Sequence, residues 1–124
     1  MNTISPNIFV ADIKQTISFY KQLGFNVIMT APEQGDIFWA MMTCGNVTFM
    51  FQTFESLGDD MPEISRHTGG SLLLYINIKN IRDFFEKVKS NVTVLAELNK
   101  TFYGATEFSI CDNNGYVLTF AEHE

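Results

Sequence analysis

Basic residues are scarce in this chain of 124 residues. It has 8 lysines and arginines against 14 aspartates and glutamates, which gives a formal net charge of −6. Binding to nucleic acid through its phosphates needs clusters of Lys and Arg, so the composition argues against that class of function. The acidic balance favours solubility and attracts cationic ligands instead.

Long hydrophobic runs, cysteine and histidine are scarce as well. No apolar run approaches the roughly 20 residues that a membrane-spanning helix needs, and residues 1–14 do not have the pattern of a signal peptide. Two cysteines, Cys44 and Cys111, fit a reducing compartment, so we expect a cytoplasmic location. With only His67 and His123 available, a Cys–His pair in a plausible context is missing, as are a phosphate loop and a nucleophile elbow.

The chain is rich in apolar and aromatic residues. Hydrophobic residues make up 46% of it and charged residues 18%, with 12 Phe and 6 Met. This composition excludes a disordered chain, and the length predicts a single domain over residues 1–124.

The sequence contains an internal repeat. Residues 9–27 align without a gap on residues 74–92, which places Ile13 on Ile78 and Phe19 on Phe84. A fainter match follows in each half. Two copies of one supersecondary unit predict a fold built from paired halves, with a binding site where the halves meet.

Hydrophobic spacing and turn residues predict the order βαβββ in each half. In the first half, Asp12 is the expected N-cap of the helix and Gly24 its end; Asn77 is the expected cap in the second half. The expected strands are residues 8–10, 25–30, 37–43, 47–52, 72–76, 93–96, 107–111 and 116–121, and the second helix is 78–88. This gives a first module over about 1–53, a linker over about 54–70 and a second module over about 71–124.

Two segments carry a resemblance to a known family. The segment VADI…FYKQLGF at residues 10–25 and the segment YGATEF…DNNGY at residues 103–116 resemble the motifs of the vicinal oxygen chelate superfamily. This superfamily includes glyoxalase I, extradiol dioxygenases and bleomycin-resistance proteins. The resemblance implies an α+β fold in which two tandem βαβββ modules pair into a curved sheet around a central cleft. It also implies a homodimer.

The superfamily's enzymes hold a divalent metal with His and Glu ligands from both halves. Carried over to this chain, their ligand positions fall at Ser5, Leu73 and Thr119, and near Phe49 within residues 48–50. None of these residues is a carboxylate or an imidazole, which are the ligands such metals prefer. We therefore predict no metal and no cofactor, and the chain is closest in character to the metal-free bleomycin-resistance-like members.

The strands expected to line the cleft carry large apolar side chains. Trp and Tyr combine a flat apolar face with one hydrogen-bonding group, which suits a planar or amphipathic ligand, although most Phe and Met residues of a domain fill its core. The predicted ligand-binding residues are Trp39, Met41, Phe49, Phe51, Tyr103, Phe108 and Thr119. If the strand register differs by one residue, Met50 and Gln52 face the ligand in place of Phe49 and Phe51.

Glu107 is the candidate for acid–base chemistry. It lies on an apolar strand between Thr106 and Phe108, and its pKa would be raised if the side chain faced the cleft. A Glu at this place also resembles a common structural position of the family. We favour the structural role. Glu107 therefore remains a candidate only, and no catalytic residue is assigned.

Three functions remain open from the sequence. The first is a metal-independent protein that binds and sequesters a small molecule, cationic or aromatic, in an aromatic and acidic cleft. The second is a metal-dependent lyase or dioxygenase of the glyoxalase I type, with an ion held by an unexpected set such as Gln52, Glu107 and Glu122. The third is a non-catalytic sensor or partner domain.

Overall fold

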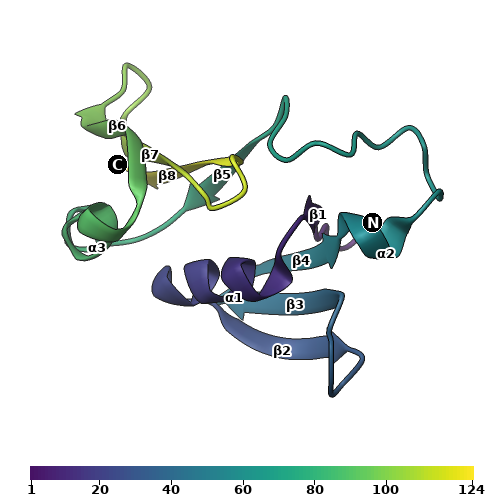
Figure 1. Ribbon diagram of the computed structural model, residues 1–124. Helices are drawn as coiled ribbons and strands as arrows, with labels where there is room; N and C mark the ends of the chain where they lie inside the picture. The colour runs from purple at the N-terminus through teal and green to yellow at the C-terminus, as the bar shows by residue number, and fades with distance from the viewer. The chain divides into compact units, whose positions relative to one another are not determined.

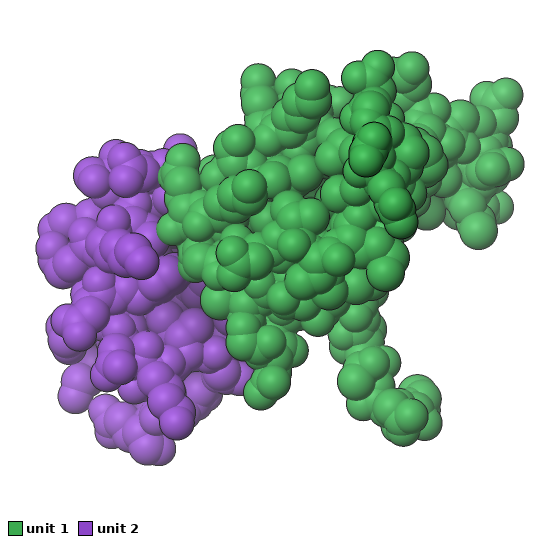
Figure 2. All heavy atoms as spheres, turned by 90° about the horizontal axis from the view of Figure 1, so that it is seen from below, with its two compact units in different colours: residues 1–68 green, residues 69–124 purple.

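The computed structural model describes residues 1–124 and divides them into two compact units, residues 1–68 and 69–124, which Figure 2 distinguishes by colour. Each unit contains one four-stranded mixed sheet, and a helix packs against one of its faces (Figure 1). The sheets have the same topology, with strand orders β1-β4-β3-β2 and β5-β8-β7-β6. The predicted α+β class, built from two βαβββ modules, is confirmed.

The first unit begins with a parallel pairing of β1 with β4 and continues through an antiparallel hairpin. Helix α1 starts as the sequence predicts, because Asp12 Oδ1 accepts the backbone N–H of Gln15 at 3.0 Å. It ends before Gly24, whose φ of +104° suits glycine. The elements are β1 Asn7–Val10, α1 Ile13–Gln22, β2 Asn26–Ala31, β3 Trp39–Cys44, β4 Val47–Thr53 and α2 Phe54–Leu57.

Aromatic rings form the core of the first unit beneath α1. Tyr20 is fully buried, and its ring meets those of Phe25 and Phe49 edge to face, with centroids 5.5 and 5.8 Å apart. The ring of Phe51, which is on the same strand as Phe49, has its centroid 4.7 Å from that of Tyr20. Burying each such ring contributes about 1.5–3 kcal/mol, so this cluster fixes which face of the sheet α1 covers.

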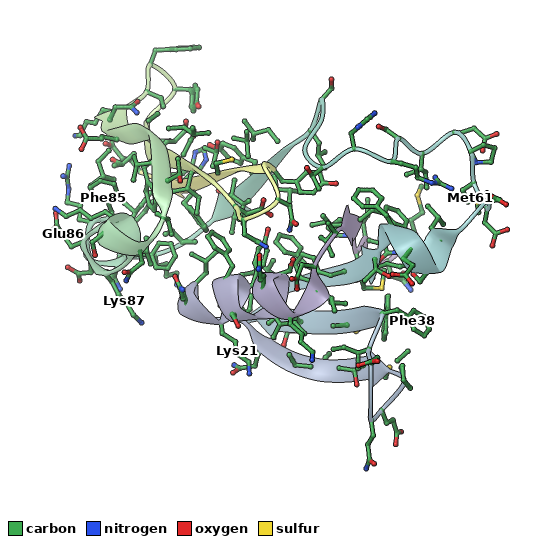
Figure 3. All side chains as sticks on the ribbon, in the orientation of Figure 1. Lys21, Phe38, Met61, Phe85, Glu86 and Lys87 are labelled. Atoms are coloured by element: carbon green, nitrogen blue, oxygen red, sulfur yellow. The ribbon has the colours of Figure 1, made fainter.

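The second unit repeats this architecture with a phenylalanine core. Its elements are β5 Leu73–Asn77, α3 Ile81–Val88, the 3-10 turn η1 Lys89–Asn91, β6 Thr93–Lys100, β7 Ala105–Cys111 and β8 Val117–His123. Figure 3 labels Phe85 on α3, which is buried, beside Glu86 and Lys87, which are exposed. None of the helices in either unit has the length and hydropathy of a membrane span.

The start of α3 differs from the prediction. The helix begins at Ile81, whereas Asn77, the expected cap, is the last residue of β5. Glu122, on β8, supplies the cap instead: its two carboxylate oxygens accept the N–H groups of Ile81 and Asn80, each at 3.1 Å. These bonds lower the pKa of Glu122. A residue 41 positions away in the chain thus does what Asp12 does locally in the first unit.

The repeat holds for elements but not residue by residue. The gapless alignment places Ile13 on Ile78, yet Ile81 is the residue that, like Ile13, is buried at the start of its helix. It also places the fully buried Val10 on Tyr75, which is 44% exposed. The gapless register was wrong because apolar residues recur at similar helical spacing in both halves and match in more than one frame.

The segment between the two modules folds around Arg66. The guanidinium donates to the main-chain carbonyls of Met61 at 2.9 Å, Ile64 at 2.7 Å and Gly58 at 2.9 Å, and also to that of Asp60. One side chain therefore satisfies four carbonyls of a turn that has no strand partner.

Candidate functional site

Each sheet has one face covered by its own helix and one face opposite that helix. On the face opposite α1, Trp39 pairs with Gln52, and Met41 pairs with Met50 on the neighbouring strand. All four side chains are half-buried. Trp39 and Met41 are two of the residues predicted to contact a ligand, and the structure places them side by side with a third methionine, Met29, which pairs with Met41 and is 56% exposed.

Phe49 and Phe51 require a correction. Both were predicted to line a ligand site, but they belong to the core under α1, where their exposed fractions are 3% and 0%. Successive residues of a strand point to opposite faces, so Met50 and Gln52 take their places on the face opposite α1. The alternative register is therefore the one that the structure has.

Two polar side chains accompany this apolar surface. The Nδ2 group of Asn7 donates to Gln52 Oε1 at 2.9 Å, and Gln52 Nε2 donates to Ser56 Oγ at 3.1 Å. Asn7 Oδ1 is buried and has no hydrogen-bond partner. A buried acceptor left unpaired is unfavourable, and a donor group on a ligand would satisfy it.

In the second unit, Thr119 lies on the face opposite α3 and Phe108 does not. Thr119 forms a hydrogen bond of 2.8 Å between its hydroxyl and that of Ser109, and its strand neighbour across the parallel pair is Tyr75. Phe108 is fully buried against Phe85 and Phe120 on the other face. Its prediction as a ligand contact was wrong, since it is a core residue.

Glu107 is the centre of a polar cluster on the face opposite α3. The hydroxyls of Tyr75 and Tyr103 both donate to Glu107 Oε2, each at 2.5 Å. Tyr75 Oη also lies 3.1 Å from His123 Nε2. Because Tyr75 gives its hydrogen to Glu107, the imidazole is the donor to Tyr75. Tyr103 was a predicted site residue, whereas Tyr75 and His123 were not assigned to a ligand site.

The donors present do not form the metal site of the superfamily's enzymes. Glu107 pairs with Ala121 on the neighbouring strand, so these two side chains lie on the same face of the sheet. Glu122 follows Ala121 along its strand, so its carboxylate points to the opposite face. Both oxygens of Glu122 are engaged at the start of α3. The proposed alternative set of Gln52, Glu107 and Glu122 is therefore not assembled, and no three His, Cys, Asp or Glu side chains are grouped as metal ligands.

The bond to Glu107 raises the pKa of Tyr75 well above its usual range, and the bond from Tyr103 to the same carboxylate raises the pKa of Tyr103. Because the folded-state pKa exceeds the unfolded value of about 10, these contacts stabilise the fold below that pH and are lost as the pH rises. Replacing Glu107 by glutamine removes the negative charge and is expected to let both phenols ionise at lower pH. The measurement is a spectrophotometric titration of tyrosinate absorbance in both proteins.

Tyr116 provides the internal control for this titration. Its pKa is raised by burial and by Asp112, so the change at Glu107 leaves it where it is. Identical titration curves for the native protein and E107Q would show that the two phenols do not bond to Glu107 in solution.

Comparison with known proteins agrees with this architecture. The profile of the Glyoxalase/Bleomycin resistance protein/Dioxygenase superfamily matches residues 2–120, so the chain belongs to this superfamily. No curated protein gives a significant match to the sequence.

Solved structures share the fold at low sequence identity. TioX from Micromonospora sp. ML1 is 15% identical, with 100% of both chains covered and a TM-score of 0.78. A protein of unknown function from Agrobacterium tumefaciens str. C58 is 22% identical, covering 100% of this chain and 95% of that chain, with a TM-score of 0.81. A bleomycin-binding protein solved in complex with bleomycin is 20% identical, with 100% of both chains covered and a TM-score of 0.69. At these identities, the likeness shows the fold alone.

Proposed function

We propose that this protein binds and sequesters a small organic molecule without a metal ion. The observation that carries the proposal is the surface formed by Met29, Trp39, Met41 and Met50 on the face opposite α1. These large side chains are only half-buried or exposed, although core residues of the same strands are fully covered. Aromatic and methionine side chains adapt to varied apolar ligands, which suits a binding surface better than a catalytic one.

Two further features support small-molecule binding. Asn7 Oδ1, next to this surface, lacks a hydrogen-bond partner that a ligand donor would provide. A protein with the same fold is known in complex with bleomycin. The net charge of −6 adds a general attraction for cationic ligands. A homodimer and a cytoplasmic location remain predictions from the sequence.

Sequestration is favoured over turnover because of the chemistry of the available side chains. The superfamily's metal positions at Ser5, Leu73 and Thr119 carry no imidazole or carboxylate. The oxygen of Glu107 nearest the phenols is occupied by two hydrogen bonds within the second unit. Nothing in this set favours a lyase or a dioxygenase.

Fluorescence of Trp39, the single tryptophan, tests the proposal directly. Titration with metal-free bleomycin is expected to quench it saturably, with the same dissociation constant in the presence and absence of a chelator. Met50→Ala should weaken binding about three- to tenfold, because it removes apolar contact area from the surface.

Met61→Ala is the matched control. Met61 is 62% exposed in the linker, so the same chemical change there should leave the affinity as it is (Figure 3). Quenching that does not saturate, or binding that a chelator abolishes, would contradict the proposal. Equal losses in the two methionine variants would show that the ligand does not use the face opposite α1.

A further inference from the structure

The carboxylate of Glu107 has one occupied oxygen and one open oxygen. Both phenol hydroxyls, those of Tyr75 and Tyr103, donate to Oε2. Oε1 receives no hydrogen bond. A carboxylate oxygen accepts such bonds strongly, and it does so best from a charged N–H group.

Glu107 also lacks a cationic partner. The ion pairs of the structure join Lys89 to Glu86 and Lys100 to Glu124, and neither includes Glu107. The carboxylate is half-buried, so its charge is less screened by water than that of a fully exposed side chain. A half-buried carboxylate with an open oxygen and no counter-charge is a place where a cationic ligand gains a charge-assisted hydrogen bond.

Aromatic rings surround this carboxylate. The ring of Tyr103 lies nearly parallel to that of His123, at 25° with centroids 6.3 Å apart, and the ring of Tyr75 is 6.1 Å from the same imidazole. Aromatic faces attract cations, and Tyr75 and Tyr103 are about half exposed, at 44% and 50%. The hydrogen bonds hold the rings and the carboxylate in one arrangement before any ligand arrives.

We propose that Glu107, with the rings of Tyr75, Tyr103 and His123, binds a protonated amine or amidine group of a small molecule. This inference rests on the proposed small-molecule binding and gives the chemistry of the group that the second unit takes. The open Oε1 selects a cation that carries N–H, and the rings add attraction for the positive charge. The site therefore discriminates against a neutral isostere and against a quaternary ammonium, which has no hydrogen to donate.

Three probes that share a benzyl group test this selectivity on the native protein. Benzylammonium carries both charge and N–H, benzyltrimethylammonium carries charge alone, and benzyl alcohol carries neither. The readout is the chemical shift of the Tyr75, Tyr103 and His123 ring signals, in buffer that keeps the amine protonated. Benzylammonium is expected to bind about tenfold more tightly than the alcohol, and more tightly than the quaternary ion.

A pair of glutamate variants separates the site from the net charge. Glu107→Gln should weaken benzylammonium binding about tenfold and leave benzyl alcohol unaffected. Glu97→Gln, at an exposed position of β6 in the same sheet, removes the same charge and should change neither. Circular dichroism checks that both variants are folded, and if E107Q is not, the probe series on the native protein decides the matter.

Each outcome separates this inference from the proposed function. Equal affinities for benzylammonium and benzyl alcohol, or equal binding by E107Q and E97Q, would overturn the amine site. Tighter binding of the quaternary ion would overturn the role of Oε1. In any of these cases, saturable quenching of Trp39 by bleomycin would still support small-molecule binding, while its absence would contradict the proposed function itself.

Discussion

Phe108→Ala is expected to lower the free energy of unfolding by about 3–5 kcal/mol, which is a large part of the roughly 5–15 kcal/mol that stabilises a typical domain. Phe108 is fully buried, and its ring centroid lies 4.9 Å from that of Phe85 and 5.1 Å from that of Phe120. Truncation removes these contacts and leaves a cavity between α3 and the sheet. Urea or thermal unfolding, followed by circular dichroism, measures the loss.

The matched control is Phe102→Ala. Phe102 is 100% exposed in the turn before β7, so the same truncation there should leave the stability within about 0.5 kcal/mol of the native protein. Equal effects of the two variants would contradict the burial of Phe108. A folded Phe108→Ala protein with native stability and weaker ligand binding would return this residue to the ligand surface.

Phe108 also shows how far the sequence could predict this protein. The period of apolar residues and the turn residues gave the order of elements, because both are local properties of the chain. They could not give the face of each strand: Phe49, Phe51 and Phe108 suit a core as well as a ligand surface. That choice depends on which face of the sheet the helix covers. On β4, α1 covers the face that carries Phe49, so Met50 faces away from the helix, which is the reverse of the prediction.

Contacts between distant parts of the chain were the least accessible. Tyr75 approaches Glu107 because β5 pairs in parallel with β8, which in turn pairs with β7. The gapless repeat had matched Tyr75 with the core residue Val10, so its role went unrecognised. Glu122 was considered as a metal ligand, yet the same topology brings it to the start of α3. A search for polar residues at alternate positions of neighbouring strands would have found the cluster around Glu107.

The turn after β7 is held by the side chain of Asp112. Asp and Asn side chains commonly fix turns by bonds to the backbone, and Asp112 Oδ1 accepts the N–H groups of Asn114 at 2.8 Å and Tyr116 at 2.9 Å. Asp112→Ala removes the acceptor of these two buried hydrogen bonds and should lower the free energy of unfolding by about 1–3 kcal/mol. Asp112→Asn retains a neutral oxygen in the same place, so its loss should be smaller.

The consequence of Asp112→Ala extends to the candidate site. The turn sets the register of β7 against β8, and that register places Glu107 opposite Ala121 and Ala105 opposite His123. A shift by one residue would move Glu107 to the face that α3 covers and break its bonds to Tyr75 and Tyr103. In Asp112→Ala protein that remains folded, titrations of Tyr75 and Tyr103 that move to lower pH would show this coupling; they are followed residue by residue, because the loss of Asp112 by itself lowers the pKa of Tyr116. Unchanged titrations of Tyr75 and Tyr103 beside a clear loss of stability would instead show that the strand register survives without the turn.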